Sequence, residues 1–394
     1  MRKHSFNRPS NLYISLSFFY FSFFVALGAF IPYWSLYLKS LGFSSIEIGE
    51  LMAIVMGSKL IAPYFLGWLS DHLQKRLIII QISSLLTIIG FSGVLVYQSY
   101  WWFVFVMTIF GFFWNAIMPL FESLTLSHLG GDSHRYSHVR LWGSIGFIII
   151  VLVLPLFIDE KQIHLLPTLV LVLLITNGLT TFLLKDKITR IDYDIDLNFK
   201  AIFKNSIVLA FLLVCALQTL SHGAYYTFFS IYLEEHQYSH NEIGVMWALG
   251  VFAEVLLFII VHKLLKLNGV FKLFVFSLFL TVLRWIILAL WVDNYILLII
   301  SQLIHAASFG LFHATAISLT SQLFPGKMHG RGQALYAGLS FGLGGALGSW
   351  LSGYSWEIMG ARWTFLVSAI IALFGAIIAA KYIKKEKLPA YAHR

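Results

Sequence analysis

Long apolar runs are the feature that most constrains this chain. A stretch of about 20 apolar residues can cross the hydrocarbon core of a bilayer as a helix, and twelve such runs follow one another along the 394 residues. They cover residues 11–38, 46–69, 77–97, 101–129, 138–158, 163–184, 206–233, 241–264, 270–292, 295–322, 332–355 and 361–383. The sequence therefore predicts an all-α integral membrane protein with twelve transmembrane helices.

The charged residues are distributed by side of the membrane. Only 11% of the residues are charged, and the net charge at pH 7 is +9. Most Lys and Arg residues fall at the N-terminus, in loops that follow even-numbered runs, and at the C-terminus, whereas Lys39, Lys161 and Arg362 fall on the other side. The positive-inside rule then predicts that both termini are cytoplasmic. Topology explains the basic charge, so we expect membrane lipids as neighbours and no nucleic-acid partner.

A polar stretch at 185–205 separates the runs into two sets of six. We expect an N-terminal six-helix bundle over 1–184, a cytoplasmic linker over 185–205 and a C-terminal six-helix bundle over 206–394. Across the linker, "SLYLKSLGFSSIEIG" (35–49) aligns without gaps to "SIYLEEHQYSHNEIG" (230–244), with seven identities in fifteen positions at an offset of 195. This repeat indicates duplication, although each copy also contains a helix-capping box, S-x-x-E, which gives a local structural reason for the similarity.

Two parallel six-helix repeats are typical of major facilitator transporters, which bind substrate and coupling ions between the halves. The loop "GWLSDHLQKR" (67–76) resembles the signature of that superfamily. The resemblance implies a conformational latch formed by Gly67, Asp71, Lys75 and Arg76. The alternative is an ordinary solvated loop of the cytoplasmic side.

Five ionisable residues lie within the predicted spans, where charges are costly and usually functional. They are Lys59, Glu122, Arg140, Glu254 and Arg284. In two antiparallel helices joined by a short turn, residues equally far from the turn lie at the same depth in the membrane. This counting pairs Glu122 with Arg140, each at most ~13 Å from the turn, and Glu254 with Arg284, each at most ~22 Å from theirs. Each pair could serve transport, or it could only hold helices together.

Lys59 has no such partner, because the next span carries no charge. The offset of 195 makes it equivalent to Glu254, which places both on one central cavity. Three cations against two carboxylates leave an excess of one positive charge. This excess predicts an anionic substrate, unless Lys59 is neutral, reaches the interface or pairs with a distant helix.

Other polar and aromatic residues of the spans complete the candidate site. His305 and His313 can relay protons, or they are satisfied core histidines. Phe147, Tyr225 and Tyr226 could stack on an aromatic substrate. The chain has no H-E-x-x-H, CxxC or Walker loop, and its glycine-rich stretch at 338–350 lies inside an apolar span, where glycines indicate close helix packing. We therefore expect no metal, no cofactor and no enzymatic activity.

Several segments resemble a narrower family. "YSHVRLWGSIGF", "SHGAYYTFFSIY", "WALGVFAEVLLF" and "LIHAASFGLFHA" are similar to segments of the bacterial 3-phenylpropionate permease family, a relative of the oligosaccharide:proton symporters. More distantly, they resemble lactose permease-like proteins. That resemblance implies that Glu122 and Arg140 form an essential pair, and that Glu254, Arg284 and His305 act in sugar binding and proton coupling.

Two departures from the lactose permease-like pattern argue against a galactoside. Phe147 replaces the tryptophan on which the sugar stacks, and Ser308 replaces the glutamate that carries the proton. By elimination, Glu254 is the expected proton carrier and Glu122 the second candidate. Arg140 is expected to form an ion pair with Glu122 and to donate bidentate hydrogen bonds to the substrate.

These observations predict a monomeric secondary transporter that couples protons to the symport of a small organic anion. An aromatic carboxylate such as 3-phenylpropionate fits cations beside aromatic walls. A nucleoside or sugar proton symporter, or a drug exporter of the same fold, is the alternative. Exporters commonly carry a Pro-Gly-rich motif in the fifth helix, where this chain has Gly143, Gly146 and only a late Pro155.

Overall fold

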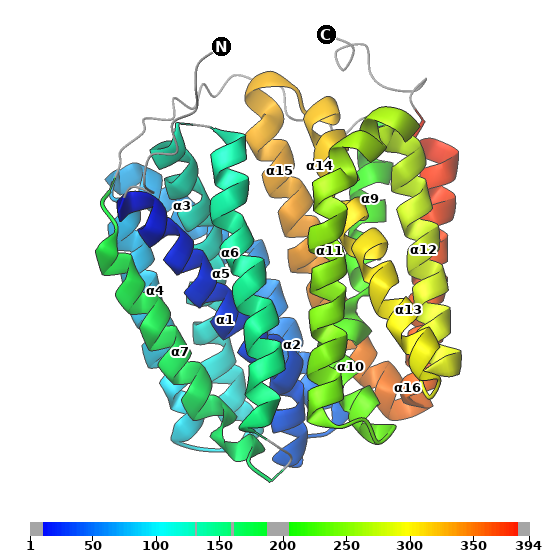
Figure 1. Ribbon diagram of the computed structural model, residues 1–394, viewed down its shortest axis with the longest axis horizontal. Coiled ribbons are helices and arrows are strands. Elements are labelled where there is room, and N and C mark those ends of the chain that lie inside the picture. Colours follow the sequence, from blue (N-terminus) through cyan, green and yellow to red (C-terminus); the bar gives the residue numbers. More distant parts are fainter. Residues whose placement is uncertain (1–10, 131, 159–160, 187–204, 385–394) are drawn as a thin grey trace.

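The computed structural model describes residues 11–130, 132–158, 161–186 and 205–384, and every regular element among them is a helix (Figure 1). The α-helices are α1 (Asn11–Ser40), α2 (Ser45–Gly57), α3 (Ala62–Leu73), α4 (Arg76–Ser92), α5 (Tyr100–Leu129), α6 (Ser133–Val153), α7 (Leu166–Thr180), α9 (Ser206–Ser221), α10 (Gly223–Glu235), α11 (His240–Asn268), α12 (Val270–Trp291), α13 (Tyr295–His305), α14 (Phe312–Leu323), α15 (His329–Ala337) and α16 (Gly345–Tyr382). Short 3₁₀ or π segments interrupt or end several spans; they include the 3₁₀ segments η1 (Ser58–Leu60) and η3 (Leu154–Leu156) and the π segments η6 (Ala306–Leu311) and η8 (Gly338–Gly344).

By length and composition, eleven helical segments among the described residues could cross a membrane. The last of them, His329–Tyr382, has 54 residues and contains two of the predicted spans. Gly360 separates these two, because its φ of 82° and ψ of 172° are not helical. The prediction of an all-α protein with twelve crossings is therefore confirmed.

Helices α1–α7 lie beside helices α9–α16 in Figure 1, and we call these two groups the N half and the C half. The predicted linker at 185–205 lies outside the described residues except for Lys185, Asp186 and Asn205. The domain boundaries therefore stay a prediction. Because α1 starts at Asn11 and α2 starts at Ser45, we name the two ends of the molecule the Asn11 end and the Ser45 end; the Asn11 end is uppermost in Figure 1.

The two halves pack closely at the Ser45 end. A Cβ added to Gly49 of α2 would lie 2.7 Å from the Cα of Gly353 in α16. On the other side of the interface, a Cβ added to Gly244 of α11 would lie 2.1 Å from the backbone oxygen of Val151 in α6. Only glycine permits such close backbone approach between membrane helices.

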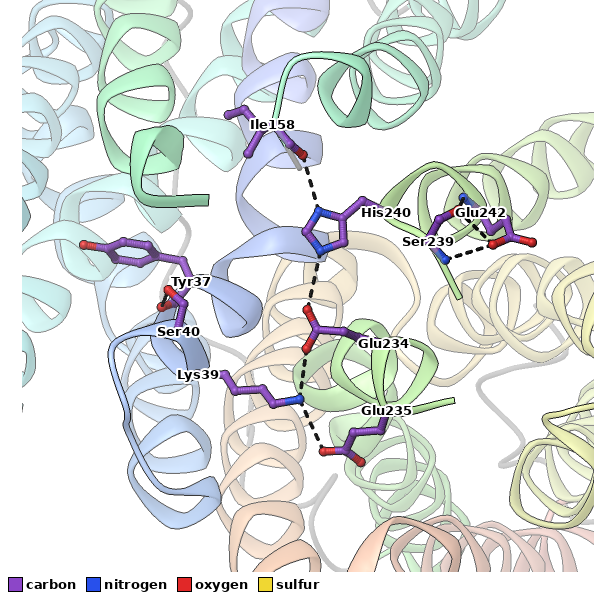
Figure 2. Close-up of polar contacts among 9 residues, drawn as sticks. All are labelled: Tyr37, Lys39, Ser40, Ile158, Glu234, Glu235, Ser239, His240 and Glu242. Atoms are coloured by element: carbon purple, nitrogen blue, oxygen red, sulfur yellow. Dashed lines mark hydrogen bonds and ion pairs between the residues drawn. The ribbon is translucent and has the colours of Figure 1, made fainter. Parts of the chain in front are cut away.

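Polar contacts join the halves at the same end (Figure 2). The Nζ atom of Lys39, at the end of α1, lies 2.9 Å from Glu234 and 3.5 Å from Glu235, both at the end of α10. His240 of α11 donates through Nδ1 to the backbone oxygen of Ile158, in the N half, at 3.3 Å. The Nε2 atom of His240 also lies 3.5 Å from Glu234, so one polar chain crosses the interface.

The repeated segment forms the same local structure in both halves. Ser44 and Glu47 cap α2 reciprocally, with the Ser44 backbone N–H donating to Glu47 Oε2 at 2.8 Å. Ser239 and Glu242 cap α11 in the same way, also at 2.8 Å. Both predicted capping boxes are confirmed, and they fix where the second helix of each half begins.

Candidate functional site

A cavity of about 270 Å³ lies between the two halves. Eight of the predicted site residues line it: Lys59, Arg140, Phe147, Tyr225, Tyr226, Glu254, His305 and His313. Its size and mainly apolar wall suit a small molecule. Because its wall comes from both halves, a bound ligand would contact each of them.

Lys59 stands where the second span is broken. α2 ends at Gly57, η1 follows, and α3 restarts with Pro63 in its first turn, where the missing N–H is tolerated. Asn115 of α5 stabilises the break by donating to the backbone oxygen of Val55 at 2.7 Å and to Ser58 Oγ at 2.8 Å. The Lys59 side chain therefore projects from a fixed irregular turn at the cavity.

Lys59 makes little contact with polar groups. Its Nζ atom lies 3.4 Å from the thioether sulfur of Met56. Within the described ranges 11–130, 132–158, 161–186 and 205–384, it forms no ion pair. The structure therefore leaves one cavity cation without a carboxylate, as the counting of charges predicts.

Arg140 and Glu122 face one another across α6 and α5. Arg140 Nε lies 4.0 Å from Glu122 Oε1, which also accepts a hydrogen bond from Tyr136 at 3.3 Å. The guanidinium stacks on the ring of Phe24, 4.1 Å from its centroid. The predicted pairing is confirmed, and the stacking leaves Arg140 on the cavity wall while Glu122 lies behind it.

Glu254 lies beside His305, with 3.8 Å between Glu254 Oε2 and His305 Nε2. His305 ends α13, and η6, a π-helical turn, follows it. Such turns widen a helix and are frequent at functional sites. Gly310 of η6 makes room for the glutamate, because a Cβ there would lie 3.0 Å from Glu254 Cγ.

The predicted pairing of Glu254 with Arg284 is wrong. Arg284 is fully buried and donates to the backbone oxygen of Ser301 at 3.0 Å and to Gln302 Oε1 at 3.4 Å. Its guanidinium stacks on Tyr225 at 4.1 Å. Counting from a turn fixes depth but not direction around the helix, and Arg284 points into the C half rather than into the cavity.

Three rings stack along the tenth predicted span. His305 and Phe309 are 5.4 Å apart at 5°, and Phe309 and His313 are 6.2 Å apart at 8°. His313 Nδ1 lies 2.9 Å from the hydroxyl of Tyr336. This column lines one side of the cavity and places Phe309 between the two histidines.

The predicted aromatic residues occupy opposite walls. Tyr225 and Tyr226 lie in α10, and the Tyr225 hydroxyl donates to Gln302 at 3.0 Å. Phe147 lies in α6 and contacts α1 at Gly28, where a Cβ would be 3.1 Å from its ring. All three line the cavity. Tyr225 is engaged by Arg284, which stacks on its ring, and by Gln302, which accepts its hydroxyl.

Sequence reasoning missed several cavity residues. They include Ser144, Gln218, Thr219, His222, Trp247, Phe309 and Phe341. Gln218 and His222 had a detectable signal, since each is an uncharged polar residue in an apolar span. A neutral side chain costs less free energy to bury in a membrane than a charged one, so charge alone did not mark these two positions as functional.

The predicted latch residues lie at the Asn11 end, between α3 and α4. Arg76 Nη2 lies 2.8 Å from Asp71 Oδ1, within one half. A Cβ on Gly67 would contact nothing within 4 Å, and Lys75 precedes α4 as its N-cap. The structure brings two of the four residues into contact, and their role as a latch stays a prediction.

Metal ligands do not gather at this site. Among the described residues, no group of three or more His, Cys, Asp or Glu side chains could hold a metal ion. The ionisable groups that line the cavity include Lys59, Arg140, Glu254 and the imidazoles.

Comparison with known proteins agrees with this architecture. Residues 13–367 match the model of the MFS_1 like family. The chain is 29% identical over 391 residues to the probable 3-phenylpropionic acid transporter of Escherichia coli (strain K12), covering 92% of this chain and 96% of that one. It is 25% identical to the maltose permease of Geobacillus stearothermophilus, covering 94% of each. The crystal structure of the nucleoside transporter NupG superposes with a TM-score of 0.81 at 18% identity, covering 95% of this chain and 99% of that one.

The family match covers most of the chain, and the fold and the cavity between the halves agree with it. The resemblance predicted from sequence is confirmed. The chain therefore belongs to the MFS_1 like family and is a secondary transporter of the major facilitator superfamily rather than an enzyme.

Proposed function

We propose that this transporter is a proton-coupled symporter of a small organic anion, an aromatic carboxylate such as 3-phenylpropionate. The observation that carries the proposal is the unpaired Lys59 on a cavity with aromatic walls. Arg140, which also belongs to the N half, adds a second cation to the cavity lining, and Glu254 is the carboxylate among the described lining residues. A relative of this chain is a probable 3-phenylpropionic acid transporter, which supports the same class of substrate.

In the proposed cycle, Glu254 takes a proton while the substrate carboxylate binds Lys59 and Arg140. Protonation removes the negative charge that would repel the anion at short range. The halves then rock, and Glu254 releases its proton toward the other side beside His305, 3.8 Å away. Proton and anion move together, so the transport of each depends on the other.

The proposed topology places both termini in the cytoplasm of a bacterial inner membrane. The Ser45 end then faces outward, and the Lys39 contacts and the glycine contacts close that side. Opening of the cavity to the outside requires these contacts to separate. We propose that one protomer suffices for the cycle, since both walls come from one chain.

Purified protein in liposomes tests the proposal. An inward proton gradient should drive accumulation of labelled 3-phenylpropionate, and a protonophore should abolish it. Lys59→Leu should weaken the apparent affinity roughly tenfold, as expected for loss of a charged hydrogen-bond partner, whereas Lys59→Arg should retain most of it. Equal uptake with and without the gradient would reject proton coupling, and wild-type affinity in Lys59→Leu would reject the anion site.

A further inference from the structure

His240 lies between two hydrogen-bond acceptors that belong to opposite halves of the protein. It is the first residue of α11 and is buried, with 6% of its surface exposed. Its Nδ1 atom lies 3.3 Å from the backbone oxygen of Ile158, in the N half, and its Nε2 atom lies 3.5 Å from Glu234 Oε1, in the C half (Figure 2). A backbone oxygen and an ionised carboxylate can only accept, so each ring nitrogen needs a hydrogen to bond its neighbour.

Only the imidazolium form of His240 can make both bonds at once. A neutral imidazole carries one N–H, so the nitrogen without it would point a lone pair at an oxygen. Protonation supplies the second hydrogen and makes both bonds charge-assisted. Because the bond to Ile158 crosses between the halves, the charged ring holds the Ser45 end closed more strongly than the neutral ring does.

The charges beside His240 favour the same form. Glu234 and Glu235 both approach one lysine, Lys39, at 2.9 Å and 3.5 Å. Two carboxylates against one ammonium give this group a net charge of −1. An imidazolium at His240 brings the sum to zero, so electrostatic attraction adds to the hydrogen bonds.

Tyr33 and Glu242 are titratable side chains near His240 that do not oppose this role. Tyr33 faces it from α1, with the ring centroids 6.5 Å apart, and its hydroxyl donates to the backbone oxygen of Val151 at 3.0 Å. A phenol is neutral near pH 7, so Tyr33 leaves the charge of the site unchanged. Glu242, on the first turn of α11, accepts from the backbone N–H and the hydroxyl of Ser239 at 2.8 Å. Its negative charge also favours a cation on the same turn.

We propose that His240 is a proton-operated lock on the Ser45 end, in which a proton bound by the ring joins α11 to Ile158 and favours closure. The direction of the lock rests on the proposed function, because the proposed topology places this end outside. A proton from the outer medium then favours closure of the outer side. A loaded transporter therefore closes behind its substrate more readily in an acidic medium, which is the condition under which a proton gradient drives uptake.

Distances between spin labels on Gln98 and Tyr295 in purified, substrate-free protein test the lock. When the pH is lowered from about 8 to about 5.5, the range in which a histidine titrates, the ratio of closed to open populations should rise roughly three- to tenfold. The sign follows from linkage, because the closed state binds this proton more tightly and loses the added stability as the pH rises. Protonation of Glu234 or Glu235 would act in the opposite direction, since it removes a charged partner of Lys39.

Three variants identify the group that titrates. His240→Gln has an amide that donates without titrating, so its populations should stay constant over this pH range. His240→Arg is charged at every pH of the series and should show the acidic populations of the wild type throughout. His236→Gln is the matched control, because His236 pairs with Asp293 at 2.5 Å within the C half. It should respond to pH as the wild type does.

Constant populations in the wild type, or opening of the Ser45 end on acidification, would overturn the lock. A response that persists in His240→Gln would also overturn it, because the titrating group would then lie elsewhere. The labels report closure without any substrate, whereas uptake of 3-phenylpropionate tests the proposed function. Failure of uptake with an intact pH response would therefore reject the proposed function alone, and uptake with no pH response would reject the lock alone.

Discussion

Lys39 and Glu234 form an ion pair at 2.9 Å although they are 195 residues apart, which is the offset that relates the two halves. They therefore occupy equivalent positions, one at the end of α1 and one at the end of α10. These two positions lie opposite each other, and their opposite charges join them. The pair joins the two halves at the Ser45 end (Figure 2).

Reversing the charge of Lys39 should open this end. Lys39→Glu places a third carboxylate beside Glu234 and Glu235. Because the lysine side chain is 37% exposed, the population of the closed state should fall only about two- to fivefold. Distances between spin labels on Gln98 and Tyr295, at the Ser45 end of opposite halves, measure the change. Lys39→Glu with Glu234→Lys should restore the wild-type distances, and unchanged distances in the single variant would contradict the role.

Gly49→Ala should separate α2 from α16. The added Cβ would lie 2.7 Å from Gly353 Cα and 2.8 Å from the Ser349 backbone oxygen. Backbone atoms cannot yield as a side chain can, so overpacking should disfavour the closed Ser45 end by about 1–3 kcal/mol. The same spin-label distances should lengthen, and transport should slow. Gly57→Ala on the same helix is the control, because its Cβ would meet Ala346 at an ordinary 3.5 Å. Identical behaviour of the two variants would contradict this account.

The helical framework could be predicted because a membrane leaves few choices. Each apolar run must form a helix to satisfy its backbone, and short turns make neighbours antiparallel. The same reasoning placed Glu122 level with Arg140, and the structure pairs them at 4.0 Å. This prediction was correct because the depth of each residue in the membrane was enough to determine the contact.

Prediction failed where direction around the helix decided the contact. Glu254 and Arg284 have similar depth by counting, yet Arg284 stacks on Tyr225 and Glu254 lies beside His305. Helix packing sets those directions, and the π-helical turn η6 shifts the register of the tenth span after His305. His222 was missed for a different reason, since a neutral side chain leaves no imbalance of charge to detect.

Arg140→Gln should abolish uptake while membrane insertion stays normal. Arg140→Lys keeps the charge but loses the planar group that stacks on Phe24 and reaches Glu122, so uptake should fall at least about tenfold. Initial rates of labelled 3-phenylpropionate uptake measure both effects, normalised to protein in the membrane fraction. Arg135→Gln on the same helix should behave as wild type, because Arg135 is 69% exposed and forms an exposed local ion pair with Asp132. Normal uptake by Arg140→Gln would contradict the proposed role.

Gly310→Ala should impair proton coupling more than substrate exchange. Its Cβ would lie 3.0 Å from Glu254 Cγ and 3.2 Å from Leu257, so Glu254 must move relative to His305. Accumulation driven by a proton gradient should fall several-fold, as expected when a catalytic geometry is displaced, whereas counterflow without a gradient should fall less. Gly330→Ala, whose Cβ would meet open space, should change neither. Equal losses in the two assays would place Gly310 outside the proton path.

The most direct test of the account is the pH of a weakly buffered suspension of de-energised cells after addition of 3-phenylpropionate. Inward symport of a proton with the anion should make the external medium alkaline. Glu254→Gln, which cannot carry the proton, should remove this signal while the protein remains in the membrane. An alkaline shift that persists in Glu254→Gln, or anion uptake by the wild-type protein without any shift, would contradict proton–anion symport through Glu254.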